Sequence, residues 1–234
     1  MRGFAPTILN LLYLLIFVYL AIFGWLISIQ RPHYVGGRLD PEQFLKQLVK
    51  KHTDAHIEVE IKLKEVGYFS KILQWIKKQP HTAENTINRI WHMDGKNMIE
   101  TIDMDDMTSA GMMSAPKYSS KKRLFKYDVP LGKLTVSLEE GLGSDKTDYD
   151  MFNAADPAIV RIKRRLSANI NDNWRVDYTR VNVADVRLSA TEVVRTAQKS
   201  SKSEMIEVEF EYIGEDVEGS FSCMSQLVGF IGTL

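Results

Sequence analysis

The fold is decided by the stretch Ile57-Glu58-Val59-Glu60-Ile61-Lys62-Leu63-Lys64, which alternates apolar and charged residues without a break. Side chains in a strand point to opposite faces in turn, so this stretch would have one aliphatic face and one charged face. An unbroken alternation over eight residues is typical of a β-strand. The charged face would carry Glu58, Glu60, Lys62 and Lys64.

Four later stretches repeat the pattern, with polar or charged side chains gathered on one face. They predict strands over residues 133–139, 161–167, 174–179 and 206–212. We therefore expect the α+β class, mainly antiparallel β with a few helices. The helices are expected to begin at Asp40-Pro41 and to cover residues 68–78, and residues 105–122 are interpreted as a flexible excursion.

Two of the predicted strands have a charged face of a single sign. One carries Arg161, Lys163 and Arg165, and the other carries three glutamates at alternate positions from 207 to 211. One such strand alone is compatible with an ordinary solvated sheet face. Solvated faces usually mix charges of both signs, and like charges at alternate positions lie only about 7 Å apart and repel. Each row therefore needs a compensating ligand or partner.

The two rows suit different ligands. Carboxylates are the oxygen ligands that Mg²⁺ or Mn²⁺ takes. Arginine and lysine suit a polyphosphate, because guanidinium groups match phosphate oxygens. If the strands close into a barrel with their charged faces inward, both rows line one cavity. The reaction class would then be metal-assisted phosphoryl transfer to water.

These motifs resemble a known family. Glu58-x-Glu60-x-Lys62 is similar to the E-x-E-x-K motif of the triphosphate tunnel metalloenzymes. The basic strand at 161–167, the stretch Trp174-Arg175-Val176-Asp177-Tyr178-Thr179 and the glutamates at 207–211 follow in that order. This order resembles the RNA triphosphatase branch, the metal-dependent capping enzymes of fungi, protozoa and large DNA viruses. Residues 133–139 resemble its middle strand, which ends in a glutamate.

The resemblance implies an eight-stranded antiparallel β-barrel, the triphosphate tunnel, with a few packing helices. It implies hydrolysis of the γ-phosphate of a 5′-triphosphate RNA end to a diphosphate end, the first step of mRNA capping, with possible NTP hydrolysis. A separate guanylyltransferase would cap that end. By position, the Mg²⁺ or Mn²⁺ ligands would be Glu58, Glu60, Glu207 and Glu209.

The resemblance also implies roles for the remaining charged residues. Glu211 would join the acidic cluster, Asp177 would support the basic strand, and Glu139 would orient water. The family has a further basic residue after the excursion. Lys121, Lys122, Arg123 and Lys126 all compete for that place, and we favour Arg123. The phosphate-binding set would be Arg123, Lys133, Arg161, Lys163, Arg165 and Arg175.

The N-terminus predicts a membrane anchor. Residues 3–30 contain no Asp, Glu, Lys or Arg, and a helix over 8–29 would be about 33 Å long, enough to span a bilayer. A cleaved signal peptide or a buried helix are the alternatives. We divide the chain into an anchor at 1–30, a linker at 31–39 and a catalytic domain at 40–234. Basic residues after the span favour a single-pass membrane protein whose catalytic domain faces the cytoplasm. If the protein is viral, the location would be the host cytoplasm or the virion membrane.

Composition limits the other functions. The chain has 30 Lys+Arg against 30 Asp+Glu, which argues against a general polyanion-binding coat. The single cysteine, Cys223, excludes a disulfide framework and a cysteine-based zinc site. His52 and His56 are interpreted as structural. Two alternatives stay open: a hydrolase of inorganic tripolyphosphate or another small triphosphate, and a catalytically silent, membrane-anchored structural protein. The oligomeric state is not predicted.

Overall fold

The computed structural model describes residues 41–51, 56–105, 116–142, 157–185 and 204–234. The chain divides after Asp40, and all the described residues lie in the second part. The helical elements are α2 (Pro41–Lys51), η1 (Val66–Tyr68), α3 (Phe69–Ile76), η2 (Val217–Ser220) and α6 (Met224–Thr233). The strands are β1 (His56–Leu63), β2 (Thr82–Met93), β3 (Lys96–Asp103), β4 (Lys117–Val129), β5 (Gly132–Gly141), β6 (Ile159–Asn169), β7 (Trp174–Ala184) and β8 (Met205–Tyr212).

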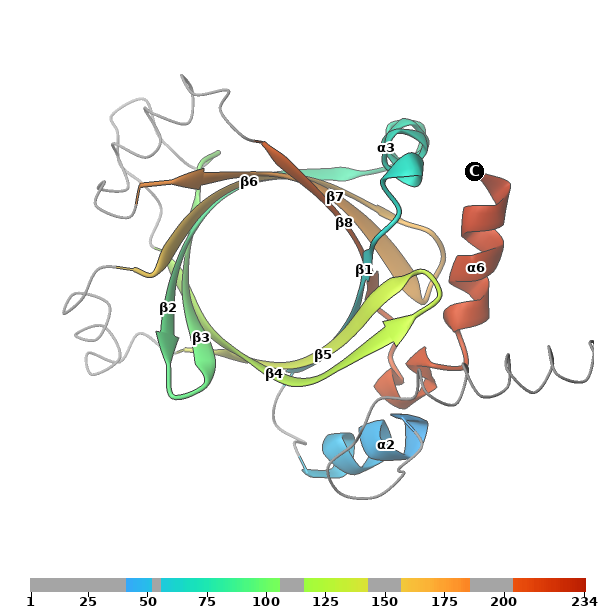
Figure 1. Ribbon diagram of the computed structural model, residues 1–234, viewed down its shortest axis with the longest axis horizontal. Helices are drawn as coiled ribbons and strands as arrows, with labels where there is room; N and C mark the ends of the chain where they lie inside the picture. Colours follow the sequence, from blue (N-terminus) through green and yellow to red (C-terminus); the bar gives the residue numbers. More distant parts are fainter. Residues whose placement is uncertain (1–40, 52–55, 106–115, 143–156, 186–203) are drawn as a thin grey trace, which may run out of the picture. The chain divides into compact units, whose positions relative to one another are not determined.

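The eight strands form one closed barrel in the order β1-β5-β4-β3-β2-β6-β7-β8. Every neighbouring pair in this ring is antiparallel. Figure 1 shows the ring of strands with helices α2, α3 and α6 on its outside. The predicted eight-stranded, mainly antiparallel β-barrel with a few helices is therefore confirmed.

The hydrophobic core lies on the outer surface of the barrel wall. The aliphatic residues that alternate with the charged ones along β1, among them Val59 and Ile61, are 1% exposed. Ile72 of α3 and Leu227 of α6 pack against them and are fully buried. The outer face of the sheet is therefore covered by helices, which leaves the charged face to line the interior.

Aromatic side chains attach α6 to the barrel. The indole of Trp174 donates a 3.1 Å hydrogen bond from Nε1 to the carbonyl oxygen of Cys223, just before α6. Its ring meets Tyr212 edge-on with centroids 5.2 Å apart. Phe230 of α6 meets Trp75 of α3 in the same way at 4.8 Å. These contacts fix the outer layer against β7 and β8, the strands with Arg175 and the glutamate row.

The predicted elements need one correction. The interpretation of 105–122 as a flexible excursion is wrong for residues 117–122, which are part of β4 and pair with β3 and β5. Residues 106–115 lie outside the described residues. The predicted helices are confirmed as α2 and as η1 with α3.

The predicted membrane anchor at 8–29 lies outside the described residues. Within the part of the chain that the structure describes, no helix is both long and apolar enough to cross a membrane.

Gly132, the first residue of β5, has no room for a side chain. A Cβ atom there would overlap the carbonyl oxygen of Lys62 on the neighbouring strand. We expect Gly132→Ala to destabilise the barrel by about 1–3 kcal/mol, because the β1–β5 backbone pairing must shift. Thermal unfolding should show a fall in Tm of several degrees, roughly 3–10 °C. Gly141→Ala is the matched control, since a Cβ there meets nothing within 4 Å. Equal Tm values for the two variants would contradict the expectation.

Candidate active site

The predicted site residues all lie on strand faces that alternate with the buried outer face, and so they line the barrel interior. The strand register places Glu60 opposite Glu211 and Lys62 opposite Glu209 across β1 and β8. On the other side of β8, Asp177 stands opposite Glu209 and Thr179 opposite Glu207. The interior-facing set is Glu58 and Glu60 (β1), Arg123 (β4), Lys133 and Glu139 (β5), Arg161, Lys163 and Arg165 (β6), Arg175 and Asp177 (β7), and Glu207, Glu209 and Glu211 (β8).

Lys121 of β4 holds the two glutamates of β1. Its ammonium forms an ion pair with Glu58, and lies 3.2 Å from Oε1 of Glu60. Burial works against the charged lysine, but Glu60 and Glu58 outweigh it and raise the pKa of Lys121. The ammonium therefore stays charged and occupies the space between these carboxylates.

Glu58 and Glu139 form a carboxyl pair across β1 and β5. Burial and a hydrogen bond to Glu139 raise the pKa of Glu58, whereas the same hydrogen bond lowers the pKa of Glu139. Within this pair the shared hydrogen bond favours a proton on Glu58 over one on Glu139, while Lys121 acts against protonation of Glu58. A carboxylate at Glu139 can accept a hydrogen bond from water.

Glu207 is held between the β1 lysine and the basic strand. Nζ of Lys62 lies 2.5 Å from Oε1 of Glu207, and Nη2 of Arg161 lies 2.6 Å from its Oε2. Although burial opposes ionisation, these two cations lower the pKa of Glu207. The first arginine of the basic row is thereby neutralised by a predicted metal ligand.

A second network lies around Asp177, whose side chain is 3% exposed. The guanidinium of Arg175 donates to it twice, with Nε 2.9 Å from Oδ1 and Nη2 3.1 Å from Oδ2. The same Nη2 lies 2.5 Å from Oε2 of Glu211, and Nη1 of Arg165 lies 3.5 Å from Oδ2 of Asp177. Asp177 therefore orients Arg165 and Arg175, two of the predicted phosphate-binding residues.

Glu209 and Lys163 are half-buried interior charges without a direct partner in the described part of the chain. Among the residues that the structure describes, neither Glu209 nor Lys163 makes a side-chain hydrogen bond or ion pair. Burial, with the nearby carboxylates Glu60 and Glu207, raises the pKa of Glu209. Burial, with the flanking arginines 165 and 161, lowers the pKa of Lys163 to about 8. The glutamate is thus placed where a cation would stabilise it, and the lysine where an anion would.

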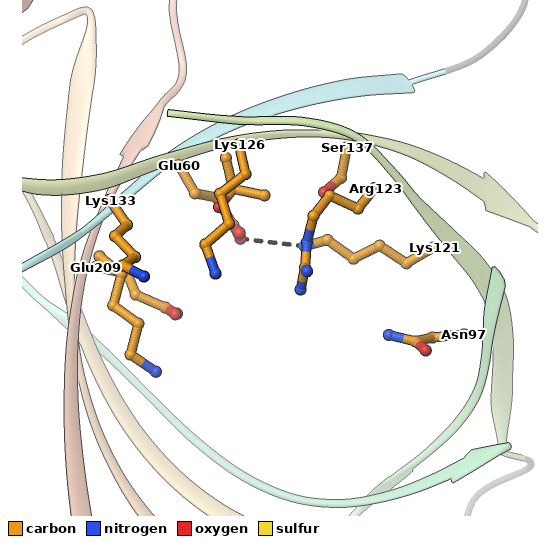
Figure 2. Close-up of a pocket in the computed structure, with 10 residues that line it drawn as sticks. Glu60, Asn97, Lys121, Arg123, Lys126, Lys133, Ser137 and Glu209 are labelled. Atoms are coloured by element: carbon orange, nitrogen blue, oxygen red, sulfur yellow. Dashed lines mark hydrogen bonds and ion pairs between the residues drawn. The ribbon is translucent and has the colours of Figure 1, made fainter. Parts of the chain in front are cut away.

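A cavity of about 270 Å³ extends from the glutamates of β1 and β8 to the cations of β4 and β5. Figure 2 shows Lys121, Arg123, Lys126 and Lys133 projecting toward the same space as Glu60 and Glu209. The favoured residue Arg123 lines this cavity, and so do Lys121 and Lys126. A register shift between Arg123 and Phe125 brings all three to the inner face, because the bulge changes the alternation. Lys122 stands opposite the buried Leu138, on the outer face.

The four predicted metal ligands are not gathered into a cluster. Among the described residues, no three His, Cys, Asp or Glu side chains lie close enough together to form a metal-binding group. Glu58 and Glu60 are held by Lys121, whereas Glu207 is held by Lys62. The carboxylates of β1 and the carboxylate of Glu207 on β8 thus form ion pairs with two different lysines.

Sequence reasoning missed the roles of Lys62 and Lys121. Lys62 belongs to the E-x-E-x-K motif and was expected only to share its face. Lys121 falls in a run of basic residues where the strand phase cannot be fixed without knowing the bulge. A count of charges could have found both, because the buried carboxylates of β1 and β8 need counter-charges from neighbouring strands.

No protein-family model matches this sequence, and no curated protein matches it. Solved structures do. The mimivirus capping enzyme triphosphatase matches with a TM-score of 0.54 at 14% identity, over 82% of this chain and 98% of that chain. A second structure, described as the RNA triphosphatase domain of a trifunctional mimivirus mRNA capping enzyme, matches with a TM-score of 0.53 at 14% identity, over 82% and 94%. This likeness establishes the fold: the barrel is the tunnel fold of those capping-enzyme triphosphatases.

Proposed function

We propose that this protein is a metal-dependent RNA 5′-triphosphatase, which hydrolyses the γ-phosphate of 5′-triphosphate RNA to leave a 5′-diphosphate end. Three features support the proposal: the tunnel fold, the order of the motifs, and an interior with carboxylates on β1 and β8 and cations on β6. The observation that carries it is the pair of unpartnered interior charges. Among the described residues, neither Glu209 nor Lys163 has a direct ion-pair partner, and a metal–triphosphate complex would supply one for each.

The donor chemistry fits Mg²⁺ or Mn²⁺. Glu58, Glu60, Glu207 and Glu209 offer only carboxylate oxygens, which these hard cations prefer. Burial, with Glu60 and Glu207, raises the pKa of Glu209, so the ionised form of this side chain is unfavourable in the folded protein. A bound cation would remove this electrostatic cost. When bound, the metal would neutralise charge on the phosphate undergoing transfer. Lys62 and Lys121 would have to release their carboxylates for that binding.

The chain's own residues would bind and orient the substrate. Arg161, Lys163 and Arg165 form a row along β6 that would hold the phosphate oxygens. Arg175 and Arg165 are oriented by Asp177, which fixes the direction of their donors. Glu139 would accept a hydrogen bond from the attacking water, since its hydrogen bond with Glu58, together with nearby Lys121, lowers its pKa.

Phosphate release from γ-labelled triphosphate RNA by the full chain tests the proposal. We expect release with Mn²⁺ or Mg²⁺, none with chelator, and a diphosphate end on the product. The difference between metal and chelator should exceed about 100-fold, since removing a charge clamp costs several kcal/mol of barrier. Release that persists in chelator, or a monophosphate product, would contradict the proposal. A folded chain that binds metal but releases no phosphate would favour the structural alternative.

A further inference from the structure

The two ends of the barrel differ in charge. Lys62, Lys133 and Lys126 lie on adjacent strands near the end where β1 finishes and β5 begins. We call this end the basic mouth. At the opposite end, where β2 begins and β5 finishes, Glu84 and Glu139 face inward. The arginines near that end are paired with Asp177 and Glu211.

The cations of the basic mouth stand directly beside one another. Lys62 is the cross-strand partner of Lys133, and Lys126 pairs with Thr135, one step along the same face from Lys133. Directly opposed residues have Cβ atoms about 5 Å apart, and diagonal neighbours about 7–8 Å, so these like charges repel. Lys133 and then Arg123 lower the pKa of the exposed Lys126. The repulsion is therefore present in the folded protein.

Three of the cations around this cavity have no direct partner on the protein. Among the described residues, Arg123, Lys126 and Lys133 make no side-chain ion pair or hydrogen bond, and all three are exposed. The nearby carboxylate, Asp128, stands opposite Lys133 but is held by Lys64, 2.6 Å away. In a chain with no net charge, three cations without an ion pair around one cavity favour the binding of a polyanion.

We propose that the RNA chain passes through the basic mouth, and that Lys126 binds the phosphodiester backbone of the nucleotides that follow the 5′ end. This inference rests on the proposed function. Arg123, opposite Ser137, lies deeper along the same wall than Lys126, on the side of Glu60, where the terminal phosphates would be held. Lys126 then contributes to the preference for RNA over a small triphosphate, which has no backbone to contact.

Lys126→Ala separates the two substrates. With the full chain, we expect kcat/KM for a triphosphate RNA of about ten nucleotides to fall roughly fivefold more than kcat/KM for inorganic tripolyphosphate, because only RNA loses a phosphate contact. The salt dependence of the RNA reaction should weaken by about 0.7 in log–log slope, the value for one phosphate of a single strand. Lys77→Ala, at the exposed end of α3, is the charge-matched control and should change neither quantity.

Two results would overturn the inference: an equal fall for both substrates, or an unchanged RNA rate and salt slope in Lys126→Ala. Failure of the proposed function is distinguishable, because the wild-type chain would then release no phosphate from the RNA. In that case, fluorescence anisotropy with the same RNA in chelator decides the role of the mouth. Weaker binding by Lys126→Ala than by Lys77→Ala supports it, and equal binding contradicts it.

Discussion

Replacing Glu209 by glutamine is expected to lower metal-dependent phosphate release at least about 100-fold, since a lost metal ligand costs a few kcal/mol of barrier. The same change should not destabilise the metal-free barrel. The pKa of Glu209 is raised by burial and by the neighbouring Glu60 and Glu207, so its ionised form is unfavourable in the folded state. This cost is absent below the ordinary pKa of a glutamate and is fully present above the raised one. At neutral pH, glutamine removes it.

Two measurements on Glu209→Gln separate these effects. The first is the rate of phosphate release with Mn²⁺. The second is Tm with chelator and with Mn²⁺, where wild type should gain stability from metal and the variant should gain less. Glu65→Gln is the matched control, because Glu65 is exposed and precedes η1 outside the barrel. A fast Glu209→Gln enzyme with an unchanged metal-induced shift would remove Glu209 from the metal ligands.

The strands that the sequence predicted well are those with an uninterrupted charged face. β1 and β8 alternate apolar and charged residues because one face packs in the outer core while the other lines the tunnel, and β6 does so except at Arg164. Successive residues of such a strand must therefore be apolar and charged in turn, and this alternation is visible in the sequence. The candidate site was predictable for the same reason, since its charged residues are the inward-facing residues of those strands.

The β2–β3 hairpin was not individually predicted. The inner face of β2 is mostly uncharged, with Thr86 and Asn88 opposite Lys163 and Arg161, so no row of charge marks the strand. The local sequence feature that marks this hairpin is its turn. Asp94 and Gly95 both have positive φ, 48° and 73°, as a tight two-residue hairpin turn requires. An Asp-Gly pair between two strand-like stretches could have located this hairpin.

The ion pairs between side chains inside the tunnel could not be predicted from the sequence. It depends on which strands are neighbours, and β1 pairs with β5 and β8 from distant parts of the chain. Lys121 reaches Glu58 and Glu60 across β5, which lies between β4 and β1. The bulge after Arg123 decides which basic residues of β4 turn inward. Neither the strand order nor the bulge can be read from local alternation.

Replacing Lys163 by methionine is expected to have opposite effects on catalysis and stability. Phosphate release should fall by about 100-fold or more, because a partly buried ammonium of the basic row is lost from the phosphate oxygens. The ligand-free barrel should become more stable. Burial, with Arg165 and Arg161, lowers the pKa of Lys163 from 10.5 to about 8, so protonated Lys163 destabilises the folded state at neutral pH.

The pH dependence identifies Lys163 as the source of that stabilisation. The cost of the charged lysine is complete below pH 8, decreases as pH rises from about 8 to 10.5, and is absent above that range. Methionine should therefore add up to about 3 kcal/mol near pH 7, an upper bound because the ammonium keeps some contact with water, and little near pH 10. Chemical denaturation at the two pH values, with exposed Lys77→Met as control, measures the difference. A destabilised variant at pH 7, or a gain that does not shrink at high pH, would mean that Lys163 is already compensated within the protein. The tunnel would then have no need of an anion at this position, and the central argument for a polyphosphate substrate would fail.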